Sequence, residues 1–283
     1  MLVDLHFHTC FSDGTMAPEE AVQKAAALSF GVLAVADHNT DEGWPRFSAA
    51  CRELGIRPIR GMEIDCSYDG RDLHLLAYGF SPTPALAGLA AKSRGLLLRM
   101  SDDLIQRLAP RYPDRGLTVE ECRGWPFDPA AGGWQCLQYL LAKGVTATLA
   151  EGMALYPRFG CDYSRYPFPP IGDVIEAVHG AGGRAVLAHP CNWFDAGEPE
   201  ALAAHLNALT GMGLDGIECY YPANSPEMTA FCCQYCRDRG MLITAGSDDH
   251  GAFGKNHHGL TYYMGAVRVD LSQLVLKELL ESE

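Results

Sequence analysis

The sequence of 283 residues lacks any apolar run of about 18 residues, the length that a membrane-spanning helix needs. It opens with Met-Leu-Val-Asp-Leu-His-Phe-His, which provides neither the basic nor the apolar segment of a secretory signal peptide. The eleven cysteines are an odd number without an even spacing framework, which is typical of reduced thiols. We therefore expect a cytoplasmic protein that makes no membrane contact.

Positive charge is also scarce, since 22 Lys and Arg residues face 35 Asp and Glu residues, for a formal net charge of −13. A chain of this charge should not hold duplex nucleic acid by long-range attraction, because phosphate backbones are themselves anionic. Small anionic partners remain possible wherever cations, including metal ions, are concentrated locally. Much of the acidic excess is explained by a solvated surface, and part of it by carboxylates gathered around metal.

Short apolar runs alternate with helical patterns, as expected for a parallel sheet that is buried on both faces. The predicted strands are residues 2–8, 31–37, 57–63, 73–79, 184–189, 215–220 and 241–247. The predicted helices between and after them are residues 18–28, 42–53, 171–180, 198–209, 226–239 and 271–282. The alternation indicates an α/β fold, either a barrel or an open doubly wound sheet.

The alternation stops between residues 82 and 169. Helical patterns lie near residues 85–108, 134–143 and 146–156, with loops rich in proline and glycine between them and no strand pattern. We therefore expect a core formed by residues 1–81 and 170–283, with a helical insertion at 82–169. Residues 83–168 carry eight Arg and two Lys against five Asp and three Glu, a net charge of +2. This charge suits a lid over an anionic ligand, and equally an ordinary charged helical surface.

Many polar side chains follow the predicted strands at the point where each strand ends. The histidines are His6, His8, His38, His74, His189 and His250, and the acids are Asp4, Asp13, Asp37, Glu63 and Asp248. The carboxyl ends of parallel strands meet at one edge, where sites form. Burying so many polar groups costs several kcal/mol each unless they are paired, and divalent cations pair them. The sequence therefore predicts a site for more than one metal ion.

The chain resembles the PHP (polymerase and histidinol phosphatase) family of metal-dependent phosphoesterases. The resemblance covers residues 4–79 and 171–251 and rests on motifs in their expected order: His6-Phe-His8, Ser12-Asp13-Gly14, Asp37-His38-Asn39-Thr40, Glu63, His74, His189-Pro190 and Ser247-Asp248-Asp249-His250-Gly251. It implies a distorted seven-stranded (β/α) barrel. The insertion resembles the one in the branch of the family that acts on nucleotides and oligonucleotide ends.

The resemblance also implies three metal ions and their ligands. The first ion would take His6, His8, Glu63 and Asp248, the second Glu63, His74 and His189, and the third Asp13, His38 and His250. This mixture of nitrogen and oxygen ligands suits Mn²⁺, Fe²⁺ or Zn²⁺. We therefore expect two to three divalent cations as cofactors.

The expected activity is hydrolysis of a phosphate ester by a metal-activated hydroxide. The first candidate substrate is a nucleoside 3′,5′-bisphosphate or another small nucleotide, and the 5′ end of an oligonucleotide is the next. Glu63, bridging two metals, and Asp248 are the expected catalytic residues. The proton for the leaving oxygen comes either from Asp248 or from a metal-bound water. A phosphatase of the histidinol-phosphate type and a non-catalytic, metal-stabilised PHP module remain alternatives.

Phosphate needs further cationic contacts, and the arginine guanidinium suits its oxygens. The predicted contacts are Arg158 and Arg165, with Lys143 next. Relatives that act on nucleotides often carry Arg-Pro-His in the insertion, where this chain reads Gly132-Gly133-Trp134-Gln135-Cys136. Trp134, Tyr156 and Phe159 either stack on a base or pack inside the insertion.

Overall fold

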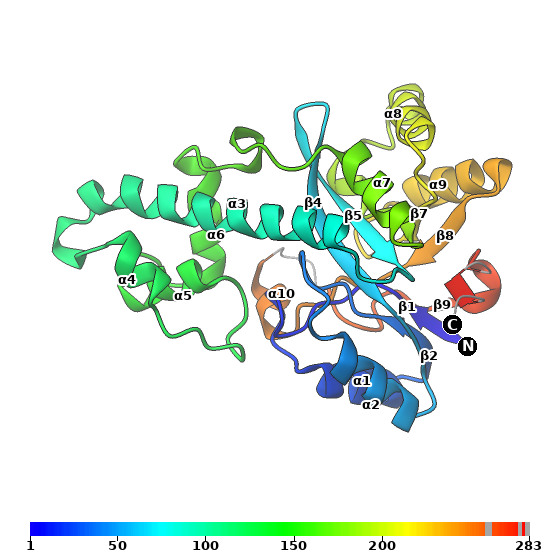
Figure 1. The fold of residues 1–283 in the computed structure, drawn as a ribbon, viewed down its shortest axis with the longest axis horizontal. Coiled ribbons are helices and arrows are strands. Elements are labelled where there is room, and N and C mark those ends of the chain that lie inside the picture. Colours follow the sequence, from blue (N-terminus) through cyan, green and yellow to red (C-terminus); the bar gives the residue numbers. More distant parts are fainter. Residues whose placement is uncertain (258–261, 277–278, 281–283) are drawn as a thin grey trace.

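Two β-sheets form the centre of the computed structural model, which describes residues 1–257, 262–276 and 279–280 (Figure 1). The four-stranded sheet has the order β3 (Arg57–Ile59), β2 (Phe30–Ala34), β1 (Leu2–Asp4) and β9 (Val269–Asp270). The five-stranded sheet has the order β4 (Gly61–Tyr68), β5 (Arg71–Tyr78), β6 (Arg184–Leu187), β7 (Gly216–Tyr220) and β8 (Leu242–Ala245).

Both sheets mix parallel and antiparallel pairs, so the fold is mixed α/β. β1, β2 and β3 run parallel, as do β6, β7 and β8, whereas β9, β4 and β5 make antiparallel pairs. Among the described residues neither sheet closes on itself, so the expected seven-stranded barrel is not what the structure shows. Two isolated bridges join the sheets: Phe7 with Asp249, which follow β1 and β8, and His38, which follows β2, with Glu63 near the start of β4.

One predicted strand, residues 57–63, is in fact two strands that belong to different sheets. β3 ends at Ile59 and β4 begins at Gly61. A Cβ at Gly61 would lie 2.5 Å from the Val35 carbonyl oxygen, so only glycine allows this close passage between the sheets. The break places Glu63 near the start of β4, where it bridges to His38, just after β2.

The β4–β5 hairpin is a second difference from the sequence prediction. Its two-residue turn is Asp69-Gly70, with φ angles of +50° and +72°, as a type I′ turn requires. The turn sets an antiparallel register in which Asp65 lies opposite His74. The sequence prediction placed residues 73–79 in a parallel sheet and missed this turn.

Helices cover the outer faces of the two sheets. The helices α1 (Pro18–Ala27) and α2 (Trp44–Glu53) share an apolar cluster with β2. The helices α7 (Ile171–Gly180), α8 (Pro199–Gly211) and α9 (Pro226–Arg239) pack in the main cluster with the five-stranded sheet. Short 3₁₀ helices occur at η1 (Ala109–Arg111), η2 (Pro113–Arg115), η3 (Tyr163–Arg165), η4 (Pro190–Asn192) and η5 (Leu271–Gln273).

The predicted helix at 271–282 is wrong over its first part. There the chain forms η5 and then extends, so that Val275 pairs with Ile243. Residues 277–278 and 281–283 of that prediction lie outside the described residues. Pairing with a buried strand satisfies the backbone of Val275, and this pairing overrides a weak helical pattern.

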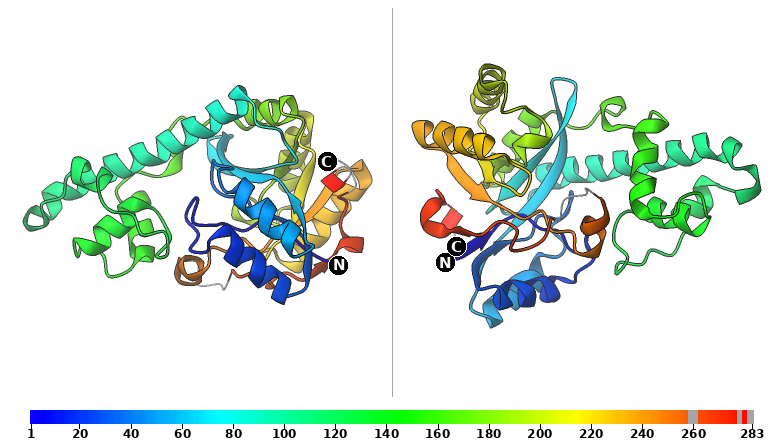
Figure 2. Two further views of the ribbon diagram at one scale, coloured as in Figure 1. Left: turned by 60° about the horizontal axis from the view of Figure 1, so that its bottom comes forward. Right: turned by 180° about the vertical axis from the view of Figure 1, so that it is seen from behind.

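Residues 82–169 are helical, as predicted, and contain no strand. They form α3 (Pro84–Leu108), α4 (Val119–Arg123), α5 (Gln135–Ala142) and α6 (Leu149–Arg158). A further helix, α10 (Ala252–His257), comes later in the chain, after β8. The insertion helices have their own apolar cluster, which includes Leu104, Leu137 and Tyr139 and which Phe253 of α10 joins. They extend to one side of the sheets (Figure 2). No helix in the described part of the chain is long and apolar enough to cross a membrane.

Candidate metal centre

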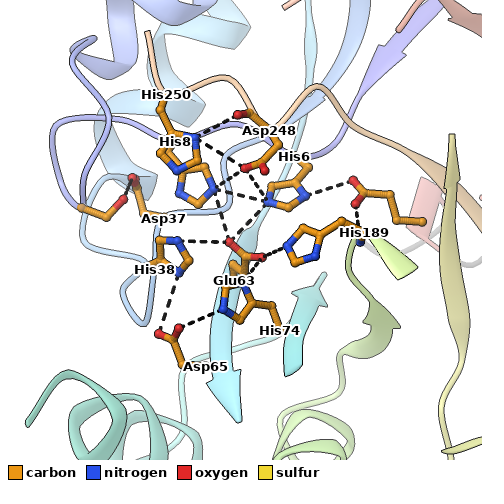
Figure 3. A network of polar contacts seen from close by, with 12 residues as sticks. His6, His8, Asp37, His38, Glu63, Asp65, His74, His189, Asp248 and His250 are labelled. Atoms are coloured by element: carbon orange, nitrogen blue, oxygen red, sulfur yellow. Dashed lines mark hydrogen bonds and ion pairs between the residues drawn. The ribbon is translucent and has the colours of Figure 1, made fainter. Parts of the chain in front are cut away.

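The predicted metal ligands converge beside the carboxyl ends of β1, β2, β6 and β8, where Glu63 of β4 and His74 of β5 meet them. Figure 3 shows the group, with Asp13 not labelled. The ligands fall into groups whose donor atoms lie within 4.8 Å of one another. The groups are His6, His8, Glu63 and Asp248; Glu63, His74 and His189; His8, Asp13, His38 and His250; and His38, Asp65 and His74. The first three groups contain the three ligand sets that the family resemblance implies, and the fourth was not expected.

Glu63 lies at the middle of the centre, and its two carboxylate oxygens face different groups. Oε2 lies 3.3 Å from Nε2 of His6 and 3.3 Å from Nε2 of His8. Oε1 lies 2.9 Å from Nδ1 of His74 and 2.9 Å from Nε2 of His189. Burial would raise the pKa of Glu63, but the charges of His6 and His74 hold it well below its ordinary value. The side chain is therefore an ionised carboxylate, placed to bridge two groups of donors.

Asp248 approaches the same histidines from the loop after β8. Its Oδ1 lies 3.1 Å from Nε2 of His8 and 3.4 Å from Nε2 of His6, and its Oδ2 accepts a hydrogen bond of 2.9 Å from the Tyr221 hydroxyl. Its backbone φ is +52°, in the left-handed region that non-glycine residues rarely adopt. Backbone strain of this kind is found where a site fixes the position of a side chain.

Asp13 reaches the centre because the chain turns back sharply after β1. At Gly14 a Cβ would lie 2.5 Å from the His8 carbonyl oxygen, so glycine permits the turn. Asp13 Oδ1 lies 3.6 Å from Nδ1 of His8, and Oδ2 lies 3.4 Å from Nε2 of His250. Burial would raise the pKa of Asp13, but the charges of His250 and His38 lower it below its ordinary value.

Two other strand-end acids hold loops and do not face the donor groups. Asp37 accepts hydrogen bonds from the Thr9 amide at 2.7 Å, the Thr9 hydroxyl at 2.6 Å and the Ser12 hydroxyl at 2.7 Å. Asp4 accepts from the Ser247 amide at 3.0 Å. Both carboxylates therefore fix the loops that carry the ligands.

Asp65 is a buried carboxylate of the centre that sequence reasoning missed. Its Oδ1 lies 3.2 Å from Nε2 of His74, and its Oδ2 lies 3.8 Å from Nδ1 of His38. Its amide donates to Oδ1 of Asn39 at 3.1 Å. The available signal was spacing, since Glu63 and Asp65 are two apart on one strand and so face the same side.

Glu218 is the second missed residue. It is fully buried on β7, its Oε1 lies 3.0 Å from Nδ1 of His6, and its Oε2 accepts from the His189 amide at 2.8 Å. The signal was an acid inside an otherwise apolar strand, Ile217-Glu218-Cys219, because acids are rarely buried without a partner. Glu218 orients the ring of His6 so that Nε2 faces Glu63.

The donor set fits divalent cations. Within the described residues, several buried side-chain atoms of the centre have no hydrogen-bond partner: His8 Nδ1, Asp13 Oδ1, His38 Nδ1, Asp65 Oδ1, His189 Nδ1 and Asp248 Oδ1. Buried polar atoms are normally paired, so such a concentration of unpaired donors and acceptors needs a partner of another kind. Imidazole and carboxylate ligands together suit Mn²⁺, Fe²⁺ or Zn²⁺.

A cavity of about 580 Å³ lies beside the centre, with His38 and Ser12 in its wall and most of its remaining lining from the insertion. Trp134 and Tyr156 line the cavity, and the Trp134 ring lies 5.8 Å from the His38 ring. Phe159 is not part of the lining and packs against the insertion's apolar cluster.

The three predicted phosphate contacts lie outside this cavity lining. Arg165 forms an ion pair with Asp162 at 3.3 Å, Lys143 pairs with Glu121 at 2.7 Å, and the side chain of Arg158 is exposed. The two arginines that do line the cavity are Arg94 and Arg123. Sequence alone did not show which face of each insertion helix turns toward the core.

Comparison with known proteins gives relatives over most of the chain. A 5′-3′ exoribonuclease of Haemophilus influenzae is 27% identical over 254 residues, which cover 87% of this chain and 89% of the relative. A phosphoribosyl 1,2-cyclic phosphate 1,2-diphosphodiesterase of Eggerthella lenta is 29% identical, with 91% and 97% covered. A 3′,5′-nucleoside bisphosphate phosphatase of Chromobacterium violaceum is 27% identical, with 88% and 87% covered.

The fold is also known from solved structures. A presumed metal-dependent phosphoesterase of Bifidobacterium adolescentis superposes with a TM-score of 0.76 at 28% identity, covering 98% of this chain and 95% of that one. The family model for the PHP domain matches residues 4–109, which carry Glu63 and the ligands of the N-terminal strands. The match in this segment is to the same family that the sequence motifs resemble.

Proposed function

We propose that this chain is a metal-dependent phosphoesterase that hydrolyses a phosphate ester of a small nucleotide or of an oligonucleotide 5′ end. The observation that carries the proposal is the convergence of buried, unpaired histidine and carboxylate atoms around Glu63, beside a cavity. The relatives support it, because the names of all three describe cleavage of phosphate esters.

In this proposal two to three divalent cations, Mn²⁺, Fe²⁺ or Zn²⁺, are the cofactors. Bound cations of this kind supply a hydroxide at neutral pH and neutralise charge on the phosphate oxygens. The residues that would hold them are His6, His8, Asp13, His38, Glu63, His74, His189, Asp248 and His250.

Glu63 and Asp248 have separate roles in the proposed reaction. Glu63 holds two donor groups in a fixed relation, because its two oxygens face different histidines. Oε2 faces His6, His8 and His38, and Oε1 faces His74 and His189. Asp248 handles the proton, because Oδ2 is fixed by Tyr221 whereas Oδ1 has no hydrogen-bond partner among the described residues. In this proposal Oδ1 would relay a proton from the attacking water to the leaving oxygen.

We further propose that residues 82–169 form a lid over the core of residues 1–81 and 170–283. The cavity supports this division, since its wall combines core residues such as His38 with residues of α3 and α5. The net charge of −13 disfavours duplex nucleic acid, whereas a small anionic substrate would be neutralised locally by the bound cations. All eleven cysteines are free, which suits the reducing cytoplasm.

The test is phosphate or nucleotide release by Mn²⁺-loaded protein from a panel of compounds. The panel contains adenosine 3′-monophosphate, adenosine 3′,5′-bisphosphate, a 5′-phosphorylated oligoribonucleotide and histidinol phosphate. We expect turnover of a nucleotide or the oligonucleotide that is lost in His6→Ala and kept in His205→Ala, a histidine on α8 outside the centre. Preference for histidinol phosphate would favour the smaller-metabolite alternative, and no turnover of any compound would favour a non-catalytic module.

A further inference from the structure

The cavity beside the metal centre has few cationic groups that a second phosphate could use. Arg123 is engaged with Asp102, with Nε donating to Oδ1 at 3.0 Å and a second short contact through Nη2. Arg94 donates to the Asn39 carbonyl oxygen at 2.5 Å. Two further acids, Asp72 and Asp162, also lie in the lining. Both arginines of the described lining are therefore already engaged, and two of its three acids are paired as well, Asp102 with Arg123 and Asp162 with Arg165.

A phosphate group placed in this lining would be poorly compensated. Among the described residues of the lining, each arginine already has another partner, and a buried charge is costly unless it is paired. Lys143 and Arg165, which sequence reasoning expected to supply positive charge, pair with their own neighbours outside the lining. The metal centre is therefore the place where a substrate's negative charge can be neutralised.

Aromatic rings of the insertion lie next to the ligand histidines. The Trp134 ring is 5.8 Å from the His38 ring, and the Tyr163 ring is 6.3 Å from the His74 ring. The preceding loop is tied to the ligand loop, since the Gly133 amide donates to the Asp13 carbonyl oxygen at 2.8 Å. This hydrogen bond fixes Trp134 over the centre, where it offers a flat apolar face.

The rest of the cavity continues this apolar character. Away from the centre the wall includes Leu97, Leu98, Met100 and Met153. Cavities lined in this way take flat or apolar groups and fix them through a few polar contacts. A ring stacked on Trp134 would gain from burial without needing a charged partner.

We propose that the preferred substrate carries a single phosphate, held at the metal centre, on an uncharged group with a flat ring that occupies the cavity. This inference rests on the proposed function and narrows it, because it places a nucleoside monophosphate above a nucleoside 3′,5′-bisphosphate. Selection against the bisphosphate arises from a largely apolar lining whose arginines already have partners, and selection for the ring arises from Trp134.

The experiment compares adenosine 3′-monophosphate with adenosine 3′,5′-bisphosphate, which differ only in the second phosphate. For the Mn²⁺-loaded protein we expect kcat/KM to be at least about tenfold higher for the monophosphate. Equal or higher kcat/KM for the bisphosphate overturns the inference. If neither these two compounds nor the 5′-phosphorylated oligoribonucleotide is hydrolysed, the proposed function fails. Affinities of the two mononucleotides measured by calorimetry still decide the inference, which is overturned if the bisphosphate binds more tightly.

A matched pair of variants tests whether cavity charge is the cause. Leu98 lines the cavity and is 56% exposed, so Leu98→Arg adds a cation without disturbing the core. Leu141 is 38% exposed on α5, outside the lining, and Leu141→Arg is the control. We expect Leu98→Arg to raise kcat/KM for the bisphosphate, so that the ratio of kcat/KM for the monophosphate to that for the bisphosphate falls by about tenfold. Leu141→Arg should leave this ratio unchanged. If the ratio of kcat/KM for the two substrates is unchanged in Leu98→Arg, the charge of the cavity is not the cause of the selectivity.

Discussion

Each imidazole of the centre offers two nitrogens, and the protein assigns them different partners. In His6, Nε2 faces Glu63 while Nδ1 lies 3.0 Å from Glu218. In His74, Nδ1 faces Glu63 while Nε2 lies 3.2 Å from Asp65. A carboxylate behind a ligand histidine fixes the ring and its tautomer, and raises its basicity. Asp65 and Glu218 are therefore positioning residues for the metal ligands.

This arrangement predicts that Glu218→Gln weakens metal binding. The amide keeps the volume of the side chain but removes the charge that orients His6 and the His189 amide. We expect the affinity for Mn²⁺ to fall by about 10–100-fold in a titration of metal-free protein. Glu176→Gln, at an exposed position of α7, is the control and should bind as the parent does. Parental affinity in Glu218→Gln would contradict the role given to this carboxylate.

The sequence predicted much of the centre at this scale, and the reason is geometric. The positions of His6, His38 and Asp248 follow from the rule that strand ends share an edge. Sequence reasoning missed Glu218 because this residue lies within its strand, where periodicity predicts only packing. It also missed Arg94 and Arg123 of the cavity lining, because a helical pattern does not show which face of the helix packs toward the sheets.

At the scale of elements, the contact between β1 and β8 depends on one glycine. A Cβ at Gly246 would lie 2.2 Å from the His6 Cβ and 2.4 Å from Oε1 of Glu218. The backbone at the end of β8 can therefore approach β1 only because this side chain is missing.

We predict that Gly246→Ala displaces His6 and destabilises the protein by about 1–3 kcal/mol, the usual range for overpacking. Urea unfolding would measure the free energy, and the same Mn²⁺ titration would show weaker binding. Gly180→Ala is the control, because a Cβ there meets nothing within 4 Å. Equal stability of the two variants would show that the strand ends move apart readily.

The elements that sequence reasoning misjudged were decided by local turns. Asp69-Gly70 was a readable hairpin signal, yet the apolar run of β5 was read as one more parallel strand. The break between β3 and β4 was missed, because the sequence prediction treats Arg57 to Glu63 as one strand although Gly61 lies inside it. Tertiary packing of Gly61 against the Val35 carbonyl divides it.

At the scale of the whole molecule, the insertion has an apolar core distinct from those of the sheets. Leu137 is fully buried in it, so Leu137→Ala should lower the free energy of unfolding by about 2–5 kcal/mol. Urea unfolding measures this loss, and the bound metal per chain should stay at the parental value, because the ligands come from the core. Leu141→Ala, at an exposed position, should change neither quantity. Metal loss in Leu137→Ala would show that the insertion supports the centre itself.

The central claim is that the clustered histidines and carboxylates bind divalent cations on which phosphate ester hydrolysis depends. The most direct measurement removes metal with a chelator, adds Mn²⁺ back in steps, and follows bound metal and adenosine 3′-monophosphate hydrolysis on the same samples. The account predicts no activity without metal, and activity that rises with occupancy up to two or three ions per chain. Full activity in the metal-free protein, or metal binding unchanged in His6→Ala, would contradict it.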